Sequence, residues 1–249
     1  MTTKRSITSQ LLASIMVNAI YAMVNYPIVL VSTILAPFSL LIVITFVSHG
    51  ALTPVAIGGA LIMTMISSGT SMQQDLSHLK NDFKVQDMVV SSPAKAWIYL
   101  LGMSASEVIY SLPALAVLAV LAALYIHTSI MGYLALIAVL LIMFAFASSL
   151  GFLLSTLSSD IVQSWAFSGI VSTILSALPP VYYPITYIPI PFRYLAYLSP
   201  ATYAAEIVQS ITGLASFGYG TLLLDWVVII AVTLVTMLLA IKKSKWRED

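Results

Sequence analysis

The chain has 249 residues, of which 60% are hydrophobic and only 8% are charged, and its mean hydropathy is +1.03. A soluble domain carries about 25% charged residues, so this composition excludes a water-soluble fold and predicts a chain embedded in lipid. The net charge of +1 gives no electrostatic basis for binding nucleic acid. The absence of cysteine excludes disulfides, thiolate metal sites and cysteine nucleophiles.

The basic residues are concentrated in three segments. Nine of the ten Lys and Arg residues lie within 1–5, 80–95 and 242–249, and the tenth is Arg193. Cytoplasmic loops of membrane proteins carry the excess of Lys and Arg, and this bias orients the spans. We therefore expect a multi-pass protein of the cell membrane with both termini and residues 80–95 in the cytoplasm, and with Arg193 on the outer side.

The first predicted element is an amphipathic helix at residues 6–26. Apolar residues recur every four positions from Ile7 and from Leu12, and polar side chains occupy the opposite side. This pattern is typical of a helix that lies in the membrane interface, and Pro27 is expected to end it. The alternative is a true span, which would place the N-terminal basic residues outside the cell, against the charge rule.

Six transmembrane helices are predicted to follow, within a single transmembrane domain, 1–249, of all-α fold. Each needs about 20 mostly apolar residues to cross the hydrocarbon. We expect them at 28–47, 54–72, 98–126, 133–154, 161–178 and 222–241. The second is weakly apolar and rich in Gly, Ser and Thr, so it is expected to pack against protein rather than lipid.

Residues 75–96, between the second and third spans, form the largest charged segment. Leu76, Leu79 and Phe83 recur at three- and four-residue intervals and predict a short amphipathic helix parallel to the membrane. Phe83 and Met88 have charged neighbours, which would suit docking of a soluble protein, since interfaces combine an apolar core with a polar rim. A solvated cytoplasmic loop is the alternative.

Residues 179–220, between the fifth and sixth spans, differ from a simple loop. They contain six of the chain's eleven prolines, and six tyrosines lie between 182 and 203. Because amphipathic aromatic rings settle at the level of the lipid headgroups, we expect short helices that re-enter or lie on the outer leaflet, one of them over 193–211. Within that helix, Glu206 could pair with Arg193.

No catalytic motif is present in the sequence. It lacks the P-loop G-x-x-x-x-G-K-[ST], the H-E-x-x-H zinc motif and the G-x-S-x-G elbow. The three histidines, His49, His78 and His127, lie in three separate predicted loops, which argues against a metal cluster. The sequence therefore predicts a chain that is not an enzyme, with no catalytic residues and no bound metal or cofactor.

Glu107 is the acidic residue within the third apolar run. If that span begins at Trp97, the carboxylate lies near the bilayer midplane, where a charge costs about 2.5–3.5 kcal/mol. If it begins near Ala105, which we favour, the carboxylate lies at the cytoplasmic mouth. Its role is either a hydrogen bond to a neighbouring helix or that of a gate or proton site. Asp160 and Asp225 are expected to be helix caps or interfacial anchors.

The fifth span carries a stripe of small and hydroxyl side chains. The stripe comprises Ser164, Ser168, Ser172 and Ser176, with Gly169 and Thr173 beside them. A spacing of four residues turns about 40° beyond a full turn, so the serines lie on one side of the helix. The stripe is either simple helix packing or the lining of a translocation path or subunit seam. Its lack of charge suits an amphipathic or lipid-like cargo better than a small ion.

Two motifs lie at the end of the charged segment and after the fifth span. The first is Val-Val-Ser-Ser-Pro-Ala-Lys at 89–95 with Leu-Leu-Gly at 100–102; the second is Tyr-Pro at 183–184, Ile-Pro at 188–189 and Leu-Ser-Pro-Ala-Thr-Tyr at 198–203, followed by Glu206. Together with the order of the predicted elements, they resemble the integral membrane permease of type-2 ABC exporters, which move drugs, polysaccharides or lipids. The resemblance covers nearly the whole chain. Gln209 departs from it, because many relatives carry a basic residue there.

The resemblance implies six transmembrane helices with an amphipathic N-terminal helix, a cytoplasmic coupling helix and outer re-entrant helices. It implies a homodimer, or a dimer with a related permease, that binds separate ABC-type ATPase subunits holding ATP and Mg²⁺. Coupling to the ATPase would fall on His78, Leu79, Lys80, Asp82, Phe83, Lys84, Asp87 and Met88. The extracellular gate would comprise Tyr183, Pro184, Pro189, Pro200, Tyr203 and Glu206. The translocation path or dimer seam would include Ser164, Ser168, Ser172, Thr173 and Ser176.

The expected function is the membrane-spanning permease of an ATP-driven exporter for an amphipathic cargo, such as a drug in multidrug export, a lipid or a glycan. The alternative is a secondary transporter driven by an ion gradient. That mechanism needs membrane-embedded ionisable groups and usually internal repeats, whereas only Glu107 qualifies and no repeat is visible. A membrane scaffold or membrane enzyme is a third alternative.

Overall fold

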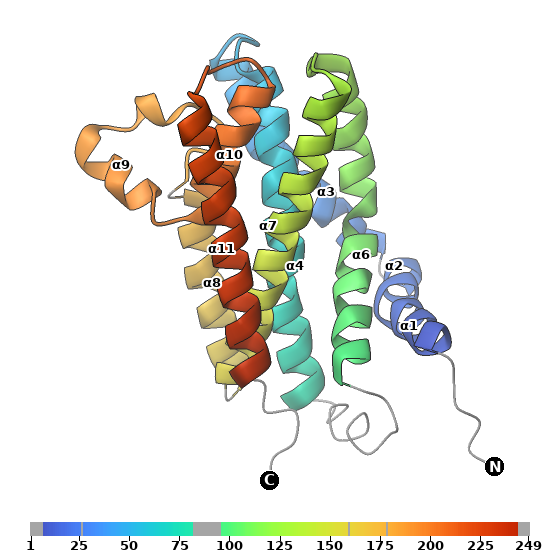
Figure 1. The fold of residues 1–249 in the computed structure, drawn as a ribbon. Coiled ribbons are helices and arrows are strands. Elements are labelled where there is room, and N and C mark those ends of the chain that lie inside the picture. Colours follow the sequence, from blue (N-terminus) through green and yellow to red (C-terminus); the bar gives the residue numbers. More distant parts are fainter. Residues whose placement is uncertain (1–6, 26, 82–95, 159, 178, 244–249) are drawn as a thin grey trace, which may run out of the picture.

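The computed structural model describes residues 7–25, 27–81, 96–158, 160–177 and 179–243. Every regular element within these ranges is a helix, and they contain no strand. The long helices stand side by side as an upright bundle, with the first helices lying obliquely along one side (Figure 1). The all-helical class predicted from the composition is therefore confirmed for the described chain.

Six long helices occupy the regions of the six predicted spans. They are α3 (Pro27–Val47), α4 (Thr53–Asn81), α6 (Ala96–Tyr125), α7 (Ile130–Leu157), α8 (Ile161–Ala177) and α11 (Tyr219–Lys243). Five segments of the described chain are long and apolar enough to cross a membrane: Ile7–Asn25, Thr53–Ser77, Leu101–Tyr125, Ile130–Leu157 and Tyr219–Lys242. The apolar parts of α3 and α8, Thr33–Val47 and Val162–Leu175, are shorter.

The N-terminal segment folds as α1 (Ile7–Ile15), a π-helical turn (Met16–Ile20) and α2 (Tyr21–Asn25). It lies against α6, where a Cβ added to Gly102 would fall 2.6 Å from Ser14 Oγ. Its other side is exposed, as at Leu12 and Val17. Ile7–Asn25, which was predicted to lie in the membrane interface, is also one of the five segments long enough to cross the membrane. Its length is therefore compatible with the alternative interpretation as a true span.

The central helix is α4, which packs against α3, α6, α7, α8 and α10. Within its apolar window 89% of the residues are buried, against 17–33% for α6, α7 and α11. Glycines allow this approach, because a Cβ on Gly69 would lie 2.5 Å from Ala147 Cβ, and one on Gly151 would lie 2.8 Å from the Gly69 carbonyl oxygen. The prediction that this helix packs against protein rather than lipid is confirmed.

α4 also extends further than the sequence indicated. Its span was predicted to end at residue 72, but the helix continues to Asn81. The first part of the predicted 75–96 segment is therefore a continuation of the central helix, because no proline or glycine interrupts the chain there. Residues 82–95 lie outside the described chain. The end of α4, the start of α6, the start of α8 and the end of α11 all lie at one end of the bundle, called the lower end here (Figure 1).

The span predicted at 161–178 is matched by a short helix. α8 has 17 residues, about 25 Å at 1.5 Å per residue, which is less than the bilayer hydrocarbon thickness of about 30 Å. The chain then leaves the bundle through a 3₁₀ turn (Ile185–Tyr187) and the short helix α9 (Ile190–Ala196). It returns as α10 (Pro200–Ile211), which packs against α11, α4 and α7 and runs toward the upper end (Figure 1).

The single helix predicted over 193–211 is wrong in one respect. It is two helices, because α9 ends at Ala196 and α10 begins at Pro200, with Tyr197–Ser199 between them. Proline has no N–H to donate and disfavours a helical conformation at the residue before it. Ser199 accordingly has an extended backbone (φ −92°, ψ 128°), and Pro200 takes the first helical position of α10.

The α4–α7 contact generates a stability prediction. Gly69→Ala places a methyl group 2.5 Å from Ala147 Cβ and 2.6 Å from the Ser148 nitrogen, so α7 has to shift. Overpacking of this kind costs about 1–3 kcal/mol. We expect a lower midpoint of thermal unfolding for the purified protein in detergent, followed by circular dichroism. Gly220→Ala is the matched control, because a Cβ there meets open space; equal midpoints for the two variants would contradict the contact.

Candidate functional site

A buried polar network joins α4 to α8 in the lower half of the bundle. Gln73 Nε2 donates to the Ser164 carbonyl oxygen at 2.9 Å and lies 3.3 Å from Ser164 Oγ. Ser164 Oγ in turn donates to Ser77 Oγ at 2.9 Å. Gln73 and Ser164 are fully buried. Hydrogen bonds between helices compensate the cost of burying these groups, so the network fixes the position of α8 against the central helix.

The predicted serine stripe is divided between two environments. Ser164 and Ser168 are buried, and Ser168 Oγ accepts from Gln74 Nε2 at 3.1 Å. Ser172 and Thr173 are exposed, and Thr173 Oγ1 donates back to the Gly169 carbonyl at 2.8 Å. The side chain of Ser176 lies outside the described part. The first half of the stripe is therefore packed against α4 and the second half faces outward, while the path or seam role stays a prediction.

The outward part of α8 is unlike the rest of the bundle surface. Gly169, Ser172 and Thr173 give it a small and weakly polar surface, and no atom lies within 4 Å of a Cβ added to Gly169. Large apolar side chains flank it at Ile170 and Ile174. Small residues allow two helix backbones to approach closely in a membrane. This surface is therefore suited to a second helix, while its flanks are suited to lipid.

Glu107 lies inside the bundle and not at an exposed mouth. It is 8% exposed on α6 and belongs to the candidate span Leu101–Tyr125. Ser71 Oγ on α4 donates to Glu107 Oε2 at 2.5 Å, and Asp75 of α4 lies next to the carboxyl group. The hydrogen bond to a neighbouring helix that was considered for Glu107 is present, and a gate or proton role stays a prediction.

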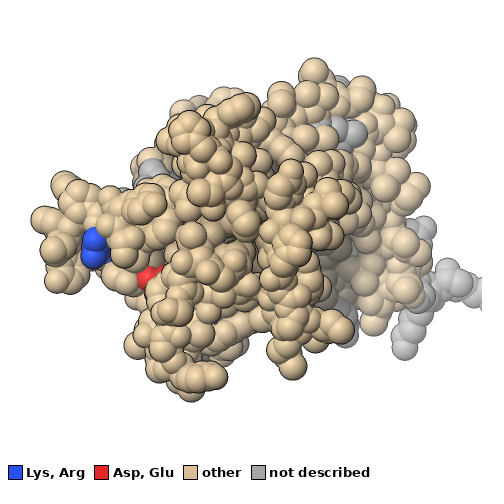
Figure 2. All heavy atoms as spheres, turned by 90° about the horizontal axis from the view of Figure 1, so that it is seen from above, with Lys and Arg blue, Asp and Glu red and all other residues tan. Residues whose placement is uncertain are grey.

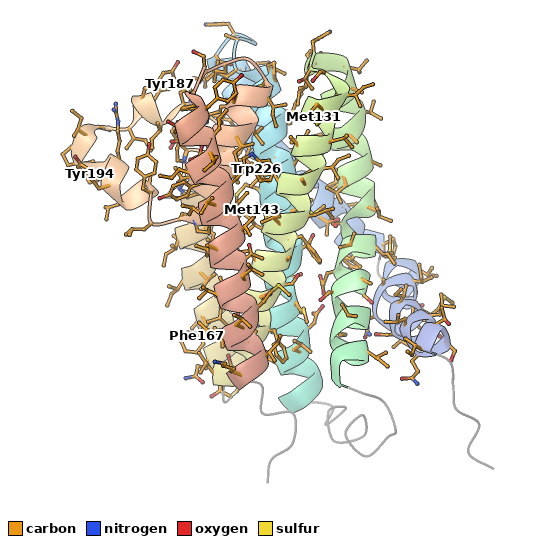
Figure 3. The ribbon with its side chains drawn as sticks, in the orientation of Figure 1. Met131, Met143, Phe167, Tyr187, Tyr194 and Trp226 are labelled. Carbon is orange, nitrogen blue, oxygen red and sulfur yellow. The ribbon has the colours of Figure 1, made fainter. Side chains whose placement is uncertain are left out.

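The outer proline- and tyrosine-rich block is held together by its own polar contacts. Tyr183 and Tyr187 stack with ring centroids 6.5 Å apart, and Thr202 Oγ1 donates to the Ala196 carbonyl. Among the predicted gate residues, Pro200 and Glu206 are buried, Tyr183, Pro184 and Tyr203 are half-buried, and Pro189 is exposed. Figure 3 shows Tyr194 of α9 directed away from the bundle and Tyr187 closer to it. The block thus has a buried root on α10 and an exposed tip.

Gln209, which departs from the family pattern, has a structural role. It is 1% exposed on α10, and its Nε2 donates to the carbonyl oxygens of Pro180 at 3.2 Å and Tyr183 at 3.0 Å. Irregular backbone at membrane depth is tolerated only where protein groups satisfy it. Gln209 therefore anchors the irregular chain after α8 to α10.

The predicted Glu206–Arg193 pair is wrong. The Arg193 guanidinium donates to the carbonyl oxygens of Ile188 at 2.7 Å and Thr186 at 2.8 Å. Glu206 Oε1 instead accepts from the Tyr197 hydroxyl at 2.9 Å. The 3₁₀ turn and α9 curl back on themselves, so Arg193 meets carbonyl groups of its own loop before it can reach α10.

Of the two carboxylates expected at span ends, one fits the prediction. Asp160 Oδ1 accepts from the Gln163 nitrogen at 2.7 Å, as a cap at the start of α8. Asp225 is neither a cap nor an interfacial anchor, because it lies inside α11 and is 1% exposed. Its position facing α10 could not be deduced from the sequence, because nothing in the sequence shows which side of α11 faces protein.

Three of the predicted coupling residues lie at the lower end. His78, Leu79 and Lys80 belong to the last turn of α4, although their side chains are not described. The remainder, Asp82, Phe83, Lys84, Asp87 and Met88, lie outside the described chain. The described residues contain no group of three or more His, Cys, Asp or Glu placed to hold a metal ion.

Sequence reasoning missed the residues of α4 that bind α8 and α6. These are Ser71, Gln73, Gln74 and Ser77. The sequence carried a signal in the two adjacent glutamines after the predicted second span, because an amide that is buried there, as Gln73 is, favours a hydrogen bond to a neighbouring helix. What the sequence did not show was the helix that supplies the partner.

The sequence matches the family model described as "ABC-2 type transporter" over residues 8–212. The matched region runs from α1 through the end of α10, and so includes the central helix, the α8 stripe and the outer block. No curated protein matches the chain.

The divided stripe leads to a paired prediction. Ser164→Leu introduces a larger side chain into a fully buried site between α8 and α4, and should lower the free energy of unfolding by about 1–3 kcal/mol. Ser172→Leu makes the same exchange on the exposed face and should change it by no more than about 0.5 kcal/mol. Thermal unfolding of both variants in the same detergent measures the difference; a more damaging Ser172→Leu would reverse the assignment of the two faces.

Proposed function

Because the chain belongs to the ABC-2 type transporter family, we propose that it is the membrane-spanning permease subunit of an ATP-driven exporter. It forms the translocation path for an amphipathic cargo, of drug, lipid or glycan type, and ATP and Mg²⁺ are held by separate ATPase subunits. The family match over 8–212 carries this proposal. The lack of a P-loop in the sequence agrees with it, because the energy has to come from another chain.

In this proposal the lower end of the bundle is cytoplasmic and binds the ATPase. The clustering of Lys around residues 80–95 and at the C-terminus supports that orientation. The coupling residues 78–88 include the end of α4, which runs as one helix into the centre of the bundle. A push at the lower end would move α4, and α4 would carry α8 with it through Gln73 and Ser164.

The outward half of the α8 stripe, Gly169, Ser172 and Thr173, is the proposed dimer seam or path. Its small side chains leave open space beside the helix, and its lack of charge suits a cargo with a large apolar part. The outer block of residues 183–206 would then form the extracellular gate. Its exposed tip and buried root on α10 support this role, because a gate has to move against a fixed base.

Docking is tested with Phe83→Asp. A carboxylate in place of the ring should remove an apolar contact with the ATPase and abolish its co-purification with the permease, while the variant still inserts in the membrane. Tyr219→Asp is the control, because Tyr219 is 95% exposed at the start of α11, away from the lower end. An intact complex with Phe83→Asp would contradict docking at this segment. A secondary transporter would be indicated instead if transport continued after the partner's ATP site was inactivated but stopped when an ion gradient was collapsed.

The seam is tested by cross-linking, for which the cysteine-free chain is well suited. Ser172→Cys creates the only thiol, so oxidation in membranes should give a covalent dimer if two α8 helices meet. Val117→Cys, on an exposed position of α6, is the matched control and should stay monomeric. Equal yields from both variants would show random collision, and a monomer from Ser172→Cys would exclude a symmetric contact at this residue.

A further inference from the structure

We propose that Glu206 and Asp225, at the junction of α10, α11 and the outer block, form a binding site for an organic cation such as a protonated amine or quaternary ammonium group. Binding of the cation does not depend on the proposed function. Only the role of that cation as a charged group of the transported cargo rests on it. Nothing in the proposal depends on the ATPase.

The two carboxylates are buried on facing helices. Glu206 of α10 is 2% exposed and Asp225 of α11 is 1% exposed. They interact with each other and with the hydroxyl groups of Tyr197 and Tyr203, so the four groups form one cluster. Like charges this close repel, and burial deprives both of water. The repulsion is relieved when one carboxyl group holds a proton or when a positively charged group binds between them.

The cluster contains an acceptor without a partner. Asp225 Oδ2 is buried and has no hydrogen-bond donor among the described residues. Buried carboxylate oxygens are nearly always paired, and an exception points to a missing group. Glu206 differs, because its Oε1 already accepts from the Tyr197 hydroxyl at 2.9 Å. Asp225 Oδ2 is thus the atom toward which a ligand's N–H or N–CH₃ group would be directed.

The chain supplies no cation of its own to this cluster within its described part. Arg193 is the basic residue nearest in sequence, and its guanidinium donates to the carbonyl oxygens of Ile188 and Thr186. Gln209, one turn beyond Glu206, is neutral and donates to Pro180 and Tyr183. Seen from above, the molecule has hardly any charged surface, and a small acidic area lies where the protruding segment joins the bundle (Figure 2).

The surroundings favour an organic cation over a metal ion. Ca²⁺ takes six to eight oxygen ligands, and the described residues contain no third acidic or imidazole group placed to complete such a site. The rings of Tyr197 and Tyr203 lie 5.7 Å apart at 51° beside the carboxylates. Aromatic faces attract ammonium groups, particularly where water is excluded.

An entry route lies at Tyr197. Its side chain is 39% exposed while its hydroxyl reaches the buried Glu206. Tyr203 also donates to the Tyr197 carbonyl at 3.1 Å, which ties the backbone in place. In the proposed site a ligand would enter beside the Tyr197 ring, whose rotation would free Glu206 Oε1.

The site is tested by fluorescence on the full-length permease in nanodiscs, without ATPase. Trp97→Phe, Trp165→Phe and Trp246→Phe leave Trp226, next to Asp225 on α11, as the sole reporter (Figure 3). The probe is N-methyl-4-phenylpyridinium, and 4-phenylpyridine, uncharged at neutral pH, is its matched control. We expect saturable quenching by the cation, weakened by about tenfold or more in Glu206→Gln or Asp225→Asn, and weaker quenching by the neutral analogue that neither variant changes.

Two further variants keep the outcome decisive. Asp225→Glu retains the charge and should bind the cation more tightly than Asp225→Asn, which separates loss of charge from loss of structure. Asp160→Asn removes an exposed carboxylate at the lower end and should leave the affinity unchanged. The proposal is overturned if the cation binds no better than its neutral analogue, or if both carboxylate variants, eluting as single peaks in size exclusion, keep the original affinity. Docking of the ATPase would be untouched by that result.

Discussion

The close approach of α4 to α7 is the constraint on which the rest of the bundle depends. In lipid no hydrophobic force drives helices together, so association relies on dense packing and on hydrogen bonds between helices. Gly69 and Gly151 bring the two backbones together, and α4 becomes buried among five neighbours. A helix held in this way cannot move without moving its neighbours, which is the property that a coupling element needs.

A second constraint is the interrupted span formed by α8, the outer block and α10. Between the end of α8 at Ala177 and the start of α10 at Pro200, the described chain has only a 3₁₀ turn and the short helix α9, and free carbonyl groups in such a stretch would be costly at membrane depth. The side chains that donate to carbonyl groups of this stretch offset that cost; they are Gln209, Arg193 and Thr202. Because these partners lie in the block itself or on α10, the outer block is fixed at its root and free at its tip.

Two clusters of polar side chains lie toward opposite ends of the described bundle. Toward the lower end, Gln73, Ser164 and Glu107 make hydrogen bonds between helices, although Gln73 Oε1 has no partner among the described residues. Toward the upper end, Glu206 and Asp225 lie together with one oxygen unpartnered. The lower cluster joins helices through hydrogen bonds that hold them in register, whereas the upper cluster brings two buried carboxyl groups together. The two clusters therefore suit different steps of transport, the first coupling and the second recognition.

The sequence by itself determined the solvent, the class and the order of the helices. Composition required lipid, apolar runs placed six long helices close to where they lie, and the glycine- and serine-rich run of α4 indicated the buried helix. These features were predictable because they depend on the local chain and on the thickness of the membrane. Only the tertiary structure decided which face of each helix meets which neighbour. In the structure the serine stripe is buried only as far as Ser168, Arg193 binds carbonyl groups and not Glu206, and Asp225 faces the interior. The sequence could not show this, because in lipid both faces of a helix can be equally apolar, and the periodicity of apolar residues then does not indicate which face is buried.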